Sequence, residues 1–295
     1  MGKITSLIEF KGAVGNLVGY KGKDGRNVIR KRTWDVRNAK SVLQMRRRVQ
    51  WANLVNVWKA IAPYMEPSFE NKTAGQSDYN AYVQANVDNG TCVYLTKQDS
   101  RQGVTVVAPY ILCRGTLPEI PLNLVSGGKM KSDIAVGDLT LNAETTRGNL
   151  SKAILDNNSG YQNGDQLAYV VVQQIAVGTE GIPRVEVKAG RFIIDQNATD
   201  DIFDTISIND LGTTDGYLAS KASVNGGMVF IHSRKVEGKT LVSNAQLTVN
   251  NNLLSSYTSG TAQANAMQSY GVKDENYLTP TGDQYLPSTP GGGGF

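Results

Sequence analysis

Hydrophobic and polar residues alternate with a period of two between residues 104 and 249. The apolar positions fall in short runs rich in Val, Ile, Thr and Tyr, and glycine-containing turn clusters separate the runs. Successive side chains of a strand point to opposite faces of a sheet, so this alternation buries one face of each run. The pattern predicts an immunoglobulin-like β-sandwich over residues 101–249. Strands are expected at residues 104–113, 134–141, 167–177, 184–188, 191–195, 202–208, 217–224, 228–236 and 240–249, with a short helix at 150–156.

A helical period takes the place of this alternation between Ser41 and Pro63. Ser41 and Gln44 match a capping box, and no helix breaker follows until Pro63, which predicts a helix of about 21 residues. A second helix is expected at residues 78–88. The apolar residues of the first helix form two stripes, one of Met45, Val49 and Ala52 and another of Trp51, Val55, Trp58 and Ala62. One amphipathic face needs only one stripe. We therefore expect contacts on two sides, with the chain's own sandwich and with a neighbouring subunit.

The segment before this helix reads as a β-hairpin arm. Residues 14–20 and 27–32 are β-prone and flank Gly22-Lys23-Asp24-Gly25, in which Asp-Gly is a strong hairpin signal. A two-stranded ribbon is marginal in water, so this arm is expected to dock on another surface.

Beyond residue 249 the composition turns to Asn, Ser, Thr, Gln and Gly, punctuated by prolines. We expect an extended polar tail that either has no fixed structure or lies along a partner. In the second case the anchors are expected to be Tyr277, Tyr285 and Phe295. The predicted organisation is thus α+β but mostly β: a hairpin-helix leader over residues 1–100, a sandwich over 101–249 and a tail over 250–295.

The net charge of +4 conceals an uneven distribution. Residues 1–60 hold 14 Lys and Arg against three Asp and Glu, a net charge of +11, so the other 235 residues sum to −7. A basic end and an acidic body attract each other, within one chain or between copies. Arg and Trp are also the residue types that most often dominate interfaces. The candidate subunit-interface residues are Lys21, Lys23, Arg26, Arg30, Arg32, Arg46, Arg47, Arg48, Trp51 and Trp58.

The same basic residues also suit a nucleic-acid-binding module, which is the alternative interpretation. Arg46, Arg47 and Arg48 are consecutive and fan around a helix at about 100° per residue, so they do not form one row that follows a phosphate backbone. This spacing favours a protein interface.

Candidate chemistry is sparse. The one histidine, His232, lies in an apolar alternating run with no GxSxG serine motif in the chain, and Cys92 and Cys113 lack metal-ligand spacing. The acidic residues around 195–204 do not match a calcium loop, because Asp200 and Ile206 stand where Gly and Glu are required. No apolar run is long enough to span a membrane. We expect no enzyme activity, no cofactor, no metal and no membrane partner.

The residues Gly12-Ala13-Val14-Gly15-Asn16-Leu17-Val18-Gly19-Tyr20, followed by Val28-Ile29-Arg30, resemble the opening of a family of unknown function that is widespread in Bacteroidetes and present in their crAss-like phages. The similarity continues through residues 46–51, 79–81 and 110–117, and covers roughly the first 125 residues. The resemblance implies a small β-rich domain behind a hairpin-helix leader, and it supplies no catalytic residues. In a phage it implies a virion component, such as a tail or connector ring protein. The expected partners are then copies of itself and other virion proteins. The expected location is the virion, after synthesis in the host cytoplasm.

Overall fold

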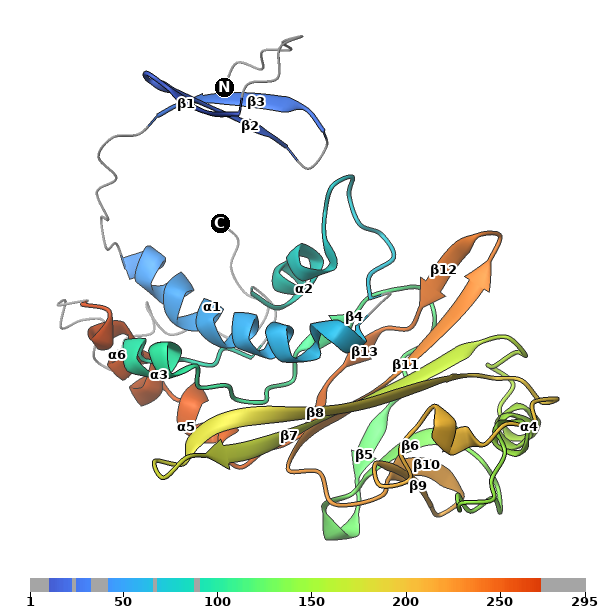
Figure 1. Ribbon diagram of the computed structural model, residues 1–295. Coiled ribbons are helices and arrows are strands. Elements are labelled where there is room, and N and C mark those ends of the chain that lie inside the picture. The colour runs from blue at the N-terminus through green and yellow to red at the C-terminus, as the bar shows by residue number, and fades with distance from the viewer. Residues whose placement is uncertain (1–10, 23–24, 33–41, 66–67, 88–90, 272–295) are drawn as a thin grey trace.

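Two antiparallel sheets and a layer of helices make up the body of the protein (Figure 1). The computed structural model describes residues 11–22, 25–32, 42–65, 68–87 and 91–271. More of these residues lie in strands than in helices, so the predicted α+β class with a majority of β structure is confirmed.

The larger sheet has the strand order β12-β11-β7-β8, and β14 also pairs with β11. All of these pairs are antiparallel, and the long β7–β8 hairpin crosses the molecule beneath the helices (Figure 1). The strands are β7 (Gln166–Val177), β8 (Ile182–Ile193), β11 (Gly226–Val236), β12 (Lys239–Val242) and β14 (Thr248–Asn250).

A smaller sheet with the order β5-β6-β10-β9 faces one side of the larger sheet. The side chains of Tyr169 and Phe230 on the larger sheet share a buried core with Met130 and Ile134 on the smaller one. The two sheets therefore face each other across a common apolar layer, as in a sandwich. The strands are β5 (Leu122–Leu124), β6 (Met130–Ala135), β9 (Leu211–Thr214) and β10 (Tyr217–Ser220), and helix α4 (Arg147–Asn157) packs beside them.

Helices cover the opposite side of the larger sheet. Strand residues such as Val170 and Ile231 pack there against Leu54 and Ile61 of the longest helix. The boundary predicted at residue 100 therefore does not separate two cores, because the leader helices and the sheet bury the same apolar layer. The elements on this side are α1 (Val42–Ile61), the 3-10 turn η1 (Ala62–Tyr64), α2 (Asp78–Val87), α3 (Lys97–Gln102), β4 (Ile111–Cys113) and β13 (Ala245–Gln246).

The two-sided character predicted for α1 is confirmed, but both sides contact the same chain. Met45 and Val49 pack against a C-terminal helix, whereas Val57 and Ile61 pack toward the sheet. The predicted capping box falls on Ser41, which lies outside the described residues. Of the second predicted stripe, Trp58 packs against α2 whereas Trp51 is 41% exposed, so the contact of this stripe with a neighbouring subunit stays a prediction.

The prediction of an extended tail from residue 250 is wrong as far as residue 271. This part of the chain forms α5 (Leu254–Thr258) and α6 (Gly260–Ser269). Ser259 caps α6 by accepting a hydrogen bond from the Ala262 amide, and Ala266 and Met267 are buried against α1. Small and polar residues form this helix because it needs only a narrow apolar stripe. Residues 272–295, with the proposed anchors Tyr277, Tyr285 and Phe295, lie outside the described residues.

Two predicted strands are also wrong in part. Only Ile111–Cys113 of residues 104–113 is a strand, because side-chain amides satisfy the preceding backbone: Asn53 bonds both the N–H and the C=O of Val106, and Gln174 accepts from the Val107 N–H. Residues 202–208 contain the 3-10 turn η3 (Ile202–Asp204), which Asp201 caps. Hydrogen bonds from side chains to the backbone produce no periodic pattern of hydrophobic residues, so sequence periodicity does not predict them. A further 3-10 turn, η2, spans Ser126–Gly128.

The remaining boundary errors concern strand ends. The runs predicted at 184–188 and 191–195 belong to the single strand β8, and the run at 240–249 divides into β12, β13 and β14. The first strand after residue 130 ends at Ala135, not at Leu141. Both cysteines are free thiols, and Cys113 is buried whereas Cys92 is only partly so.

The N-terminal arm, residues 11–32, forms a three-stranded antiparallel sheet that stands apart from the body in Figure 1. Its strands are β1 (Gly12–Val14), β2 (Leu17–Lys21) and β3 (Asn27–Lys31). The hairpin predicted between β2 and β3 is confirmed, and a second, tighter hairpin joins β1 to β2 through Gly15 and Asn16. Gly15 has a φ of +54°, which a residue without a Cβ adopts at little cost.

Candidate assembly interface

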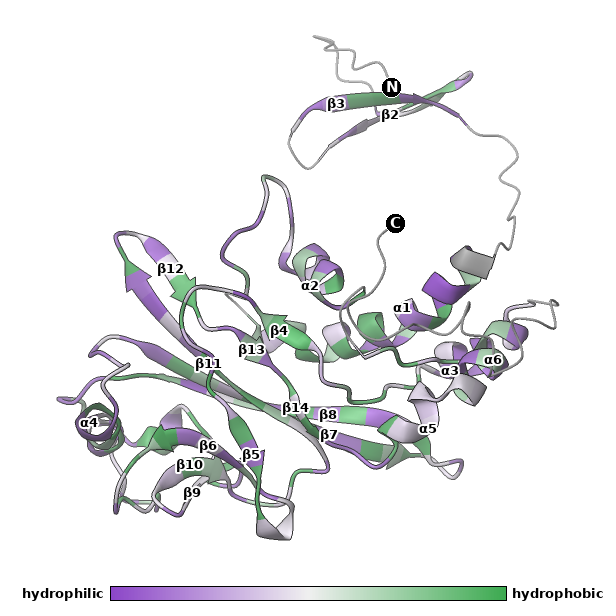
Figure 2. Cartoon of the chain, turned by 180° about the vertical axis from the view of Figure 1, so that it is seen from behind, coloured by the Kyte–Doolittle hydropathy of each residue, from purple (hydrophilic) through white to green (hydrophobic). Residues whose placement is uncertain are grey.

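The N-terminal arm exposes apolar side chains on both of its faces. Strand pairing places Val14 opposite Leu17, and these side chains are 63% and 49% exposed. On the other face Tyr20 pairs with Val28 and is 45% exposed. Isolated small sheets depend on a hydrophobic face for their stability, and this face gains most when another surface covers it. Figure 2 shows the hydrophobic residues along β3 lying outside the body. The arm therefore leaves apolar side chains exposed within the described structure.

Basic side chains line the same arm. Lys21, Arg26, Arg30 and Arg32 are all exposed, and the Arg30 guanidinium lies 5.9 Å from the centre of the Tyr20 ring. The fifth predicted arm residue, Lys23, lies outside the described residues. The described residues of the arm contain six Lys and Arg and no Asp or Glu. The arm thus combines open apolar surface with uniform positive charge.

The candidates on α1 separate into two groups. Arg46 is partly buried, whereas Arg47 and Arg48 are exposed, and Arg47 donates a hydrogen bond to the carbonyl of Val87 at 3.4 Å. Trp51 is 41% exposed and remains available at the surface.

Trp58 has a different environment. Its ring centroid lies 4.9 Å from that of Tyr82 and 6.1 Å from that of Tyr79, both on α2. This tryptophan fixes α1 against α2 inside the chain, so it is not retained as an interface candidate.

The negative charge of the body is concentrated in one part of the sequence. Residues 132–216, called here the acidic segment, hold 13 Asp and Glu against five Lys and Arg, a net charge of −8. They include α4, the β7–β8 hairpin and the loop that follows β8. In Figure 1 α4, β9 and β10 lie on the side of the larger sheet that faces away from α1 and the arm. The two ends of the molecule therefore carry opposite charge.

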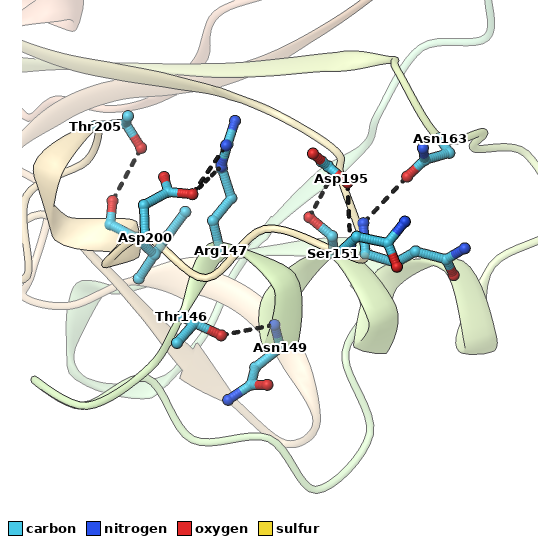
Figure 3. A network of polar contacts seen from close by, with 11 residues as sticks. Thr146, Arg147, Asn149, Ser151, Asn163, Asp195, Asp200 and Thr205 are labelled. Carbon is cyan, nitrogen blue, oxygen red and sulfur yellow. Dashed lines mark hydrogen bonds and ion pairs between the residues drawn. The ribbon is translucent and has the colours of Figure 1, made fainter.

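A network of hydrogen bonds holds the loop of the acidic segment in place (Figure 3). Arg147 at the start of α4 binds the Asp200 carboxylate through Nε and Nη2, at 3.2 and 2.9 Å. The Ser151 hydroxyl accepts from the Asp195 amide at 2.9 Å. A Cβ on Gly148 would lie 2.3 Å from the carbonyl oxygen of Ala198, so only glycine permits this approach. The loop is therefore positioned by α4, and the Asp195 and Asp201 carboxylates accept from the backbone amides of Asn197 and Phe203 within it.

A buried cluster of charged side chains occupies the end of the larger sheet. The Asp165 carboxylate contacts His232 Nε2 at 2.8 Å, Arg234 Nε at 2.7 Å and Arg234 Nη2 at 2.6 Å, and also accepts from the Gln162 amide at 2.8 Å. Burial alone raises the pKa of Asp165, but the hydrogen bonds from Arg234, Gln162 and His232 together outweigh burial and lower that pKa.

Burial lowers the pKa of His232, and the hydrogen bond and negative charge of Asp165, which raise this pKa, offset only part of the effect. The imidazole is 3% exposed and lies against the ring of Tyr161, at a centroid distance of 4.8 Å. This cluster ties the loop before β7 to β11. A catalytic base must reach a nucleophile and a substrate, whereas the groups of this cluster are enclosed by one another and by the sheet. Within the described structure the cluster therefore has the geometry of a buried structural network.

One feature of the surface, the outer edge of β8, could not be predicted from the sequence. A groove of about 410 Å³ runs beside this edge and is lined by Ala189 and by residues 203–208. An unpaired edge is a property of strand order, which periodicity does not encode. A second groove of similar volume lies between Pro109, Leu247 and Leu254.

The described residues also bear on metal binding and on membrane spanning. In this part of the chain no group of three or more His, Cys, Asp and Glu side chains is arranged to hold a metal ion. Nor is any helix of the described chain both long and apolar enough to cross a membrane. Comparison with known proteins finds no matching family model, no matching curated protein and no matching solved structure.

Proposed function

We propose that this chain is a structural subunit that assembles with copies of itself into a ring, as a component of a bacteriophage tail or head–tail connector. The observation that supports self-assembly most directly is the N-terminal arm, whose Val14, Leu17 and Tyr20 side chains are 45–63% exposed in a small sheet that no other described element covers. A second surface over these side chains would stabilise the arm by removing them from water.

The charge distribution favours another copy as that surface. The arm carries only positive charge among its described residues, whereas the acidic segment has a net charge of −8. Opposite charges on two ends of one molecule steer copies toward a head-to-tail arrangement. A head-to-tail contact uses two different patches, and it closes into a ring when the rotation between subunits permits. A ring is therefore the finite assembly that this polarity favours.

The assignment to a phage particle rests on the resemblance of residues 12–20 and 28–30 to a family that crAss-like phages carry. A role without catalysis is consistent with the environment of His232, which is enclosed by Asp165, Tyr161 and the sheet. Under this proposal the protein resides in the virion and contacts other virion proteins.

Sedimentation velocity of the full chain over a wide concentration range, combined with negative-stain images, tests the proposal. We expect one discrete closed oligomer at low salt. Arg30→Glu with Lys31→Glu reverses two exposed arm charges and should shift the oligomer toward monomer. Lys235→Glu with Lys239→Glu makes the same charge change on another exposed hairpin and should leave the oligomer intact. A chain that stays monomeric at every concentration, or that assembles equally with both variant pairs, would contradict the proposal.

Nucleic-acid binding is the second candidate function, because the arm presents exposed arginines beside the exposed Tyr20 ring. Positive charge and an aromatic platform are the elements of single-strand binding. Fluorescence anisotropy with labelled single- and double-stranded DNA at about 50 mM salt decides this point, since phosphate contacts are strongest at low salt. Binding that falls steeply with salt and is lost in the Arg30→Glu, Lys31→Glu variant would support this candidate, and no binding at 50 mM salt would remove it.

A further inference from the structure

β8 forms one edge of the larger sheet, and its outer side is open. The Pro183 carbonyl accepts from the Thr105 amide at 3.0 Å, so at this position the backbone points away from β7. The direction of the backbone groups alternates along a strand, so alternate residues from Val185 to Arg191 point outward as well. Within the described residues, these groups form no hydrogen bond beyond the ladder with β7. About 20 Å of edge is thus available to another strand, at 3.3 Å per residue.

The groove beside this edge supplies a surface for side chains. Phe203 and Ile208 contribute partly exposed apolar groups to its lining, together with the side chain and edge backbone of Ala189. The Tyr169 hydroxyl accepts from the Ser207 amide at 3.1 Å and holds this segment next to β8. Asp204 is exposed at the same place. The edge and the groove together offer main-chain hydrogen bonds, apolar contact and the carboxylates of Asp204 and Glu186. Strand β8 also carries Lys188, which pairs with Asp210 at 3.5 Å, and the exposed Arg191.

The β3 strand of the arm has the complementary properties. It ends the arm sheet, so one of its edges has no strand partner in the described structure. Its five residues span roughly 15 Å, which fits within the open part of β8. Arg30 and Lys31 are exposed at its end, and Val28 and Ile29 are only partly buried. On β8, Glu186 is exposed and, because side chains alternate, lies on the face of Gly190, where Tyr169 holds the segment around Ser207.

We propose that β3 of one copy pairs with the outer edge of β8 in the next copy, which joins the arm sheet to the larger sheet across the subunit boundary. Addition of a strand to an open edge is an established mode of protein recognition, in which main-chain hydrogen bonds give affinity and side-chain contacts give specificity. Here the specificity comes from the basic end of β3 against Glu186 and Asp204. Arg30 and Lys31 point to opposite faces of the joined sheet, so one of them faces these carboxylates and the other adds to the attraction at longer range. This inference rests on the proposed self-assembly and names the surface that receives the arm.

A charge exchange between full-length variants tests the pairing. Glu186→Lys with Asp204→Lys should weaken self-association on the order of 10-fold, as measured by sedimentation velocity at low salt. Glu144→Lys with Glu237→Lys is the matched control, since both residues are exposed carboxylates elsewhere on the body. The chain that combines Glu186→Lys and Asp204→Lys with Arg30→Glu and Lys31→Glu should recover most of the lost affinity, because each contact again joins opposite charges.

Hydrogen exchange gives an independent readout of the strand pairing. The outward amides between Val185 and Arg191 should exchange more slowly in the oligomer than in the dilute monomer, because a new strand would accept from them. Peptides that cover the β11–β12 hairpin provide the internal control and should show no change.

The outcomes separate this inference from the proposed function. Loss of assembly in the arm variant, with unchanged assembly in Glu186→Lys, Asp204→Lys and no added protection of β8, overturns the β8 site but leaves arm-mediated assembly in place. A full chain that is monomeric at every concentration overturns both. Selective loss in the β8 variant, recovery in the combined variant and slower exchange at β8 together support the pairing.

Discussion

Replacing the two most exposed apolar side chains on one face of the arm isolates the hydrophobic part of the proposed contact. Val14→Ser with Leu17→Ser removes apolar surface without changing charge. The wild-type side chains are 63% and 49% exposed in the single chain, so an interface can bury at most that further fraction. Full burial of such a side chain is worth roughly 2 kcal/mol, so each contributes about 1 kcal/mol to association. The pair should weaken self-association by about 2 kcal/mol, or roughly 30-fold in the dissociation constant.

Sedimentation velocity over a concentration series measures this change directly. The control pair is Leu124→Ser with Val236→Ser, whose wild-type side chains are 54% and 42% exposed on the body. The control should change the dissociation constant less than about threefold if the arm is the docking element. Leu17→Ile keeps the apolar surface and should preserve assembly. Equal loss in the arm pair and the control pair, or no loss in either, would refute the reasoning.

Three further predictions concern the stability of the folded chain. Burial lowers the pKa of His232 in the folded chain. On acidification the unfolded chain therefore takes up a proton first, below about pH 6.5. The free energy of unfolding should then fall by up to about 1.4 kcal/mol per pH unit. Trp58→Ala should lower the free energy of unfolding by about 2–3 kcal/mol because Trp58 packs against Tyr82, whereas Trp51→Ala should lower it by less than about 1 kcal/mol. Met267→Ala should lower it by about 2–4 kcal/mol, since this side chain is 1% exposed against α1.

Urea denaturation monitored by circular dichroism measures all three, and each has its own control. His232 is the chain's one histidine, so His232→Gln should flatten the dependence just below about pH 6.5, and a slope that persists in this variant would assign it to other groups. Equal effects of the two tryptophan replacements would contradict the separate roles given to Trp51 and Trp58. Gln268→Ala is the exposed neighbour of Met267, and similar losses at both positions would show that α6 does not pack as described.

Asp165 adds a second, more acidic transition. The lowered pKa of this carboxylate stabilises the fold above the pKa of an unfolded Asp, about 3.9, and that contribution disappears as the pH falls through the folded value. Acid unfolding should therefore steepen again below about pH 4. Acidification lowers the free energy of unfolding through both groups. For His232 the cause is burial, which disfavours its charged form, and for Asp165 the cause is hydrogen bonding, which favours its charged form.

Local patterns in the sequence identified the elements that depend on neighbouring residues. The Asp24-Gly25 turn predicted the β2–β3 hairpin, and the uninterrupted helical period predicted α1 through Ile61. Apolar β-prone runs bounded by turn residues located β7 and β11 within two residues at each end. These elements can be predicted from the sequence because backbone geometry sets the spacing of their hydrophobic residues.

Patterns failed where tertiary contacts replaced backbone hydrogen bonds. Residues 104–110 look like a strand because they are apolar and β-branched, yet Asn53 and Gln174 satisfy part of their backbone from other elements. The sequence of helix α6 resembles a polar low-complexity segment, because α6 buries only a few residues, such as Ala266 and Met267, against α1. In both cases the deciding partner lies more than 50 residues away in the sequence.

For the candidate interface, the sequence by itself determined the charge of the N-terminal arm and its β2–β3 hairpin. Only the tertiary structure decided which candidates remain at the surface: Trp51 stays exposed, whereas Trp58 is used between α1 and α2. The structure also determined the strand order that leaves the outer edge of β8 open. The physical reason is that charge and periodicity are properties of nearby residues, whereas burial and edge pairing depend on which distant segments meet.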